Sequence, residues 1–247
     1  MYISEEVESE IIENNEEISK LLKNNELIIK AEGFNPPSDN YAIAYNKRIH
    51  FPAGYIRTSQ EFIQIYHLNN IVKDSNTKSN ISYCLQLSDY YNYLFNRFYI
   101  WGSVETMFYK YDIINLMSIM ESLIAEAIVN IYHICEQCKN INSCKLRANK
   151  GTQNNMRLSV KHLYEKKVLN LTADEIRRIN ELYDLRNRVH VRLAKNNEFL
   201  DRSFCQDTHN ELIILLKKVT EQLNEYGVVK YDNCASFVIK RRNRKSE

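Results

Sequence analysis

The chain has 247 residues, of which 44% are hydrophobic and 26% are charged. This composition is typical of a globular protein and excludes a mostly disordered one. Only five glycines and three prolines are present, so turns for a many-stranded sheet are scarce and a mainly helical fold is indicated. The formal net charge of +2 does not by itself indicate a nucleic-acid partner. The absence of a glycine-rich phosphate loop and of a dinucleotide fingerprint disfavours an ATPase or a dehydrogenase.

The chain opens with an acidic, polar stretch, MYISEEVESEIIENNEEISKLL. It resembles neither a secretory signal nor a membrane span, so we expect a cytoplasmic protein without a membrane partner. In a reducing cytoplasm, the six cysteines are expected to be thiols or metal ligands rather than disulfides. The same stretch predicts an amphipathic helix, because apolar residues recur at helical spacing at Val7, Ile11, Ile18, Leu21 and Leu22.

Residues 1–104 are expected to form an N-terminal helical extension with minor β structure. ELIIKAEGFNPPSDN and YAIAYNKRIHFPAGYI look like short strands around a Pro-Pro turn, and they are the only β material expected in this half. One helix is predicted to start near Thr58 or Ser59. Another covers ISYCLQLSDYYNYLFNRF and is expected to end before Gly102.

Residues 105–226 predict an antiparallel four-helix bundle. The first helix, residues 105–138, carries one apolar stripe formed by Ile113, Leu116, Met117, Met120, Leu123, Ile124, Ala127, Ile128 and Ile131. A shorter helix around LSVKHLYEKKV follows. The third helix, residues 173–195, starts at the capping box of Thr172 and Glu175, and the fourth starts at a similar box from Thr208 to Glu211 and stops at Gly227. Residues 227–247 form a C-terminal segment with the basic tail KRRNRKS.

The third helix of the bundle places an arginine and a histidine on its apolar side. At about 100° per residue, Arg186 falls near the centre of that side and His190 lies beside it. Desolvating an unpaired arginine costs several kcal/mol, so we expect an anionic group beside Arg186. One interpretation is that Arg186 pairs with Glu121 or Asp184 and that His190 is a core residue.

The other interpretation is chemical. Metal-free RNA cleavage requires a proton to leave the 2′-hydroxyl and requires the charged transition state to be stabilised. A histidine can titrate near neutral pH, so His190 can serve as acid or base, and Arg186 can hold a phosphate through two parallel hydrogen bonds. Asn187 can position the sugar or the phosphate. The opposite flank of the helix is either an ordinary solvent face or a strip that follows phosphates, and it carries Arg177, Arg188, Arg192 and Lys195.

A long helix containing SIMESLIAEAI, then a connecting helix, then LRNRVH resembles the HEPN superfamily of four-helix domains. The resemblance covers about half of the chain. Many HEPN members are RNases of toxin, antiphage or RNA-processing systems that build their site across a homodimer interface. It therefore implies that Arg186, Asn187 and His190 are catalytic, together with Glu121 on the first helix. Arg188, Arg192 and Lys195 are then expected to bind substrate.

The resemblance implies a metal-independent endoribonuclease that acts on RNA as a homodimer, with a possible antitoxin or defence partner. Family members usually leave a longer interval between the arginine and the histidine than the three residues in RNRVH. This shorter interval favours an alternative function, a noncatalytic RNA-binding or protein-interaction module. Asn187 and the basic flank favour the enzyme.

A cysteine cluster lies at the end of the first bundle helix, in HICEQCKNINSCK. Cys135, Cys138 and Cys144 make an incomplete zinc knuckle, because a structural zinc requires four nitrogen or sulfur ligands. In an up-and-down bundle, the start of the fourth helix lies near this loop, which suggests Cys205 as the fourth ligand, and His133 is the local competitor. Such a zinc would be structural, with no cofactor needed for catalysis. The alternative is that the cysteines are reduced and pack as small hydrophobic residues.

Overall fold

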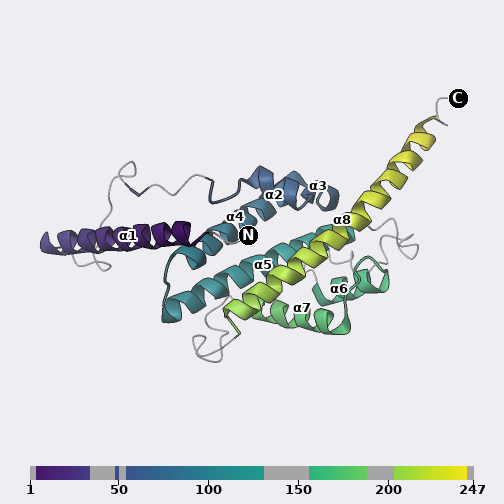
Figure 1. Cartoon of the computed structure of the whole chain (residues 1–247). Coiled ribbons are helices and arrows are strands. Elements are labelled where there is room, and N and C mark those ends of the chain that lie inside the picture. Colours follow the sequence, from purple (N-terminus) through teal and green to yellow (C-terminus); the bar gives the residue numbers. More distant parts are fainter. Residues whose placement is uncertain (1–3, 34–47, 50–53, 131–155, 188–202, 244–247) are drawn as a thin grey trace. The chain divides into compact units, whose positions relative to one another are not determined.

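The computed structural model describes residues 4–33, 48–49, 54–130, 156–187 and 203–243 (Figure 1). The chain divides into two compact units, residues 1–52 and 53–247, and each is described by itself. All regular structure in the described residues is helical, so the mainly helical prediction is confirmed. None of the described helices has a stretch long and apolar enough to cross a lipid bilayer.

The described residues of unit 1 form one helix, α1, which spans Glu5–Ala31. The Ser4 hydroxyl caps its first turn by accepting a hydrogen bond from the Val7 amide at 3.4 Å. The predicted strand ELIIKA is wrong, because residues 26–31 continue this helix. Once a helix has been nucleated, each further residue adds a hydrogen bond at little cost, and this outweighs a local β preference. The other expected β segments lie largely outside the described residues.

Unit 2 contains the remaining helices. They are α2 (Ser59–Ile65), α3 (Leu68–Ile71), α4 (Ser75–Arg97), α5 (Gly102–Asn130), α6 (Met156–Glu165), α7 (Ala173–Arg186) and α8 (Gln206–Asn243). The predicted start of α2 is confirmed, since Thr58 and Glu61 form a capping box. α4 starts at Ser75, where the Asp74 carboxylate caps it, and ends at Arg97. Gly102 does not end α4 but starts α5, with a φ of +56°.

α5 is the centre of unit 2 and contacts α3, α4, α6, α7 and α8. Its predicted apolar stripe is confirmed from Ile113 to Ala127, where these side chains are at most 2% exposed. α4 and α5 pack on each other across the expected division at residue 104. A helix with neighbours on several sides must be apolar on several faces, which explains the long apolar run of α5.

α8 differs from its prediction at both ends. It begins at Gln206, so Thr208 lies inside the first turns as a buried residue rather than as a cap. It also continues past Gly227 to Asn243. A glycine in a helix interior costs about 1 kcal/mol relative to alanine, which weakens a helix but does not by itself end it.

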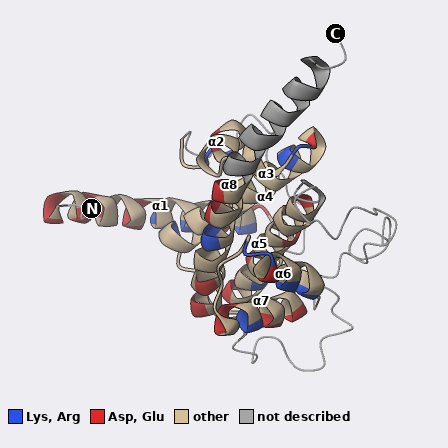
Figure 2. Cartoon of the chain, turned by 90° about the vertical axis from the view of Figure 1, so that its right-hand side faces the viewer, with Lys and Arg blue, Asp and Glu red and all other residues tan. Residues whose placement is uncertain are grey.

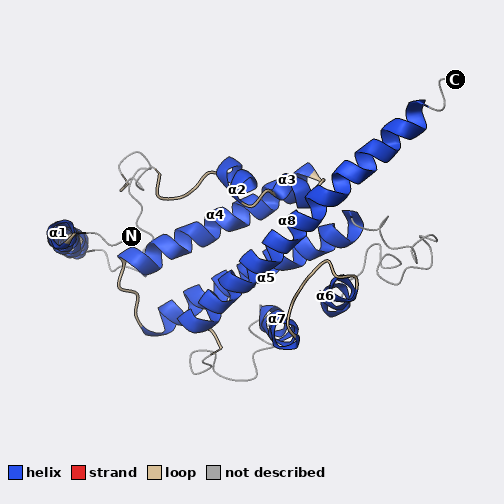
Figure 3. Cartoon of the chain, turned by 45° about the vertical axis from the view of Figure 1, so that its right-hand side comes forward, coloured by secondary structure: helices blue, strands red, loops and turns tan. Residues whose placement is uncertain are grey.

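The order of the helices in space also differs from an up-and-down bundle. α5 and α8 begin at the same end of unit 2 (Figure 1), since His209 near the start of α8 lies 2.6 Å from Asp112 in the first half of α5. α6 and α7 lie across these two helices (Figure 3). The expectation that the last helix starts beside the end of the long one is therefore wrong. With ten residues against 29, α6 spans about 15 Å and α5 about 44 Å, so α6 cannot return the chain along α5.

Candidate functional site

The candidate site lies at the end of α7. The helix starts at a confirmed capping box, in which the Thr172 hydroxyl accepts from the Glu175 amide at 3.2 Å and the Glu175 carboxylate accepts from the Thr172 amide at 2.8 Å. Arg186 is the last residue of α7, and Asn187 is its C-cap in αR conformation. The predicted helix therefore ends in the structure where the arginine-asparagine pair begins.

Arg186 is held against α5 by an acidic residue. Its Nη2 lies 2.9 Å from Oε2 of Glu121, and the two side chains are 34% and 17% exposed. The guanidinium carbon lies 5.9 Å from the centre of the Tyr183 ring. Asn187 Oδ1 accepts a hydrogen bond from Arg186 Nη1 at 3.3 Å. The structure thus brings together three of the four residues expected to be catalytic.

Tyr183 was not predicted as a site residue. Its hydroxyl donates to Glu121 Oε1 at 3.5 Å. Burial, followed by the nearby Glu121 carboxylate, raises the pKa of Tyr183, so the phenol stays protonated and remains a donor at neutral pH. Its position three residues before Arg186 places both side chains on one face of α7, which is a signal that the sequence contained.

Asp184, the other predicted partner of Arg186, contacts a different arginine. Arg157 on α6 approaches it at 2.5 Å, and both side chains are more than half exposed. The Arg186 charge is therefore met by Glu121. Of the basic flank, Arg177 forms an exposed pair with Asp174 at 2.9 Å.

The other predicted site residues on this segment lie outside the described residues. They are His190, Arg188, Arg192 and Lys195. Their roles stay predictions.

The predicted metal ligands are divided between described and undescribed parts of the chain. Cys135, Cys138, Cys144 and the competitor His133 lie outside the described residues. Cys205 is described, is half-buried, and has its Sγ 3.6 Å from Thr208 Oγ1. Within the described ranges, no three His, Cys, Asp or Glu side chains are grouped as metal ligands would be.

A buried ionisable cluster between α5 and α8 was missed from the sequence. His209 Nε2 lies 2.6 Å from Asp112 Oδ2, and the two side chains are 3% and 0% exposed. Ser88 donates to the same oxygen at 3.0 Å, and the rings of Phe95 and Tyr109 pack around the imidazole. Serine and histidine both bind the carboxylate here, so the cluster is not arranged as a nucleophile and its base. Its enclosure makes it a structural link between the helices.

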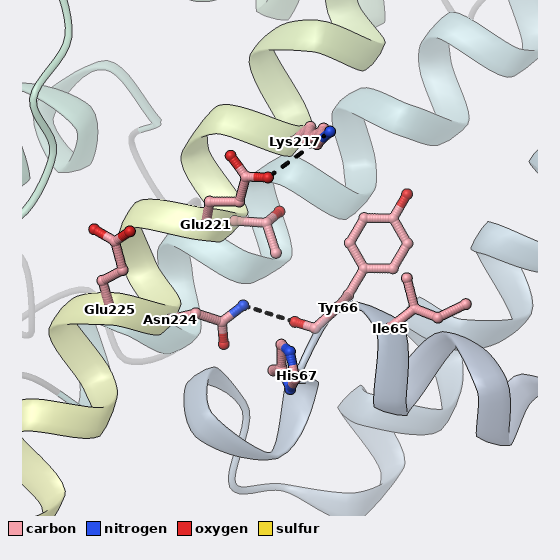
Figure 4. A pocket seen from close by; sticks show the side chains of 8 residues that line it. Ile65, Tyr66, His67, Lys217, Glu221, Asn224 and Glu225 are labelled. Carbon is pink, nitrogen blue, oxygen red and sulfur yellow. Dashed lines mark hydrogen bonds and ion pairs between the residues drawn. The ribbon is translucent and has the colours of Figure 1, made fainter.

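A cavity of about 490 Å³ lies between the turn from α2 to α3 and residues 217–225 of α8 (Figure 4). Asn224 donates to the Tyr66 carbonyl at 2.8 Å, whereas its own Oδ1 is buried and has no partner within the described part of the chain. His67 lines the cavity in a left-handed conformation, with φ +47°. None of the lining residues belongs to α5 or α7, so this cavity is separate from the Arg186 site.

No protein-family model, curated protein or solved structure matches the chain.

Proposed function

We propose that the chain is a metal-independent endoribonuclease of the HEPN type, with its site at the end of α7. The observation that supports it best is the Arg186 guanidinium, held by Glu121 and Tyr183 and still one-third exposed. A guanidinium oriented in this way has donors left for a phosphate, and it reaches solvent where an RNA backbone can approach. The HEPN assignment itself rests on the sequence resemblance.

In this proposal, Arg186 binds the scissile phosphate and stabilises the negative charge that builds up in the transition state. His190 takes the proton from the 2′-hydroxyl or gives one to the leaving oxygen, and Asn187 orients the sugar or phosphate. Glu121 is a positioning residue, because it acts through Arg186. Arg188, Arg192 and Lys195 extend the contact along the backbone.

The proposal carries further assignments. It includes a homodimer in the cytoplasm, and an antitoxin or defence partner. We also propose a structural zinc bound by Cys135, Cys138 and Cys144. The start of α8 lies beside the first half of α5 rather than its end, which favours His133 over Cys205 as the fourth zinc ligand.

A second candidate function is a noncatalytic RNA-binding or protein-interaction module. The Glu121–Arg186 ion pair favours it, because a carboxylate at 2.9 Å already satisfies the arginine without any ligand. The short interval between Arg186 and His190 also favours the noncatalytic module. In this module, the pair joins α7 to α5 and does no chemistry.

The deciding experiment compares cleavage of total RNA by the wild type and by Arg186→Ala and His190→Ala variants. For a general acid or base, removal costs about a hundredfold or more in rate, so cleavage by the His190→Ala variant should fall by at least that factor. Arg157→Ala is the matched control, since it removes an exposed arginine paired with Asp184. It should cleave like the wild type.

The variants must keep their helical circular dichroism for the comparison to count. Loss of cleavage in both folded variants, with the control active, supports the ribonuclease. Equal cleavage by all four proteins means a contaminating nuclease and contradicts the proposal. No cleavage by the wild type, together with weaker RNA retention by Arg186→Ala, assigns the noncatalytic module.

A further inference from the structure

α1 has apolar residues at regular intervals along one side. It has 27 residues and none of them is buried. Five of its apolar residues, Val7, Ile11, Ile18, Leu21 and Ile28, are between 39% and 62% exposed. An apolar stripe of this length on a soluble helix requires a partner surface.

The spacing of that stripe specifies the kind of partner. Starting from Val7, intervals of four and three residues alternate through Val7, Ile11, Asn14, Ile18, Leu21, Asn25 and Ile28. This is the a/d heptad pattern of a coiled coil, in which each core residue packs between residues of a second helix. Five of the seven core positions are Val, Ile or Leu, and the other two are asparagine. Asparagine in a coiled-coil core lowers stability but selects one register.

The charges of α1 select the direction of the second helix. Residues 5–17 contain seven glutamates and no basic residue, whereas residues 18–31 contain three lysines and one glutamate, a net charge of +2. The acidic part lies at the N-terminal end of α1 and the lysines toward the other end (Figure 2). Two parallel copies would place fourteen carboxylates side by side, within about one Debye length of each other. Two antiparallel copies place the acidic half of each helix against the half with net positive charge.

One antiparallel register also satisfies both asparagines. When Ile18 of one copy faces Leu21 of the other, Asn14 faces Asn25 and Ile11 faces Ile28. Each amide then meets an amide, the Ile18–Leu21 and Ile11–Ile28 pairs are apolar, and Val7 faces Glu32 at the end of the helix. We therefore propose that α1 pairs with α1 of a second copy of this chain as an antiparallel coiled coil. The ribonuclease proposal is not needed for this inference.

The first test is the mass of the full-length chain in solution, measured by light scattering across a dilution series. The wild type should have twice the chain mass of 29.3 kDa. Ile18→Asp places a carboxylate opposite Leu21 in the core and should raise the dissociation constant by about tenfold or more. Ile12→Asp is the matched control: Ile12 is 53% exposed, like Ile18 at 51%, but lies off the a/d stripe. This control should remain a dimer.

The second test fixes the direction, through disulfide formation mapped on peptides by mass spectrometry. Asn14→Cys alone should give no link between the two substituted positions, because they lie at opposite ends of the antiparallel pair. Asn14→Cys combined with Asn25→Cys should link position 14 of one copy to position 25 of the other. Within one helix these positions are about 16 Å apart, too far for a disulfide.

The outcomes of these tests distinguish an α1 that packs on a second copy from an α1 that packs on its own chain. A monomeric wild type, or a dimer that Ile18→Asp leaves intact, overturns the proposal. If Ile18→Asp instead lowers the free energy of unfolding of residues 53–247 at unchanged mass, α1 packs on its own chain and the proposal is wrong. A link between position 14 and position 14 means a parallel pair, which overturns the antiparallel arrangement.

Discussion

Ionisable residues on the apolar faces of α5 and α8 contact each other rather than water. Asp112 lies one residue before the buried stripe of α5 begins at Ile113, and His209 is three residues before the buried Leu212 on α8. Each residue alone would be an unpaired polar group in the core. Together, with the Ser88 hydroxyl, they satisfy each other's hydrogen bonds.

Removal of one member of this pair should destabilise the protein strongly. His209→Ala leaves the Asp112 carboxylate buried without its imidazole partner, so we expect a loss of about 3–5 kcal/mol in the free energy of unfolding. Urea denaturation followed by circular dichroism measures it. His162→Ala, at a half-buried position on α6, should cause a much smaller loss. A loss below about 1 kcal/mol in His209→Ala would mean that the pair contributes little.

The ion-pair partner of Arg186 could be predicted from the sequence only in part. The sequence required an anion beside Arg186, because desolvating a lone guanidinium is costly. It left Glu121 and Asp184 open as partners. Helix geometry explains the result, since residues two apart on a helix do not face each other. Asp184 therefore points away from Arg186, and Glu121 on α5 supplies the charge.

For α7, the sequence predicted the start of the helix correctly. Thr172 and Glu175 form the expected capping box, because the signal for a helix start is local. The same carboxylate also accepts hydrogen bonds from Lys218 on α8, at 2.6 and 2.9 Å. One side chain thus starts α7 and ties it to α8. The second connection could not be read from the sequence, because Lys218 is 43 residues away.

This double role gives Glu175 a pH-dependent effect on stability. The Lys218 ammonium, followed by the Thr172 amide, lowers the pKa of Glu175 in the folded chain. A carboxyl with a lowered pKa stabilises the fold at pH values above its ordinary pKa, and this contribution is lost as the pH falls through the lowered value. Glu175→Gln should therefore cost about 1 kcal/mol at neutral pH and progressively less toward acid pH.

Urea denaturation at several pH values measures the effect. Glu165→Gln is the control, because Glu165 forms only an exposed pair with Lys161 at 3.8 Å. It should change the stability little at any pH. A cost of Glu175→Gln that stays constant, or grows, as the pH falls would contradict the role of the ionised carboxylate.

For the whole molecule, the division into residues 1–52 and 53–247 predicts that the second unit folds alone. Among the described residues, the buried core is supplied by segments after residue 53, and α1 contributes none of it. A chain that begins at Ala53 should keep a single cooperative unfolding transition, with a midpoint close to that of the full chain. It should also lack the contact through α1, so its dissociation constant should be higher than that of the full chain. Loss of cooperative unfolding would show that the first unit is part of the folding unit.

The sequence by itself determined the helical class, the apolar stripe of α5, the starts of α2 and α7, and the need for an anion at Arg186. These follow from hydrophobic period, capping residues and desolvation cost, which act over a few residues. Only the tertiary structure decided that α5 and α8 start at the same end, that α8 continues past Gly227, and that Asp112 meets His209. Those outcomes depend on which faces meet across long stretches of chain, and packing between distant helices outweighs a local stop signal such as one glycine.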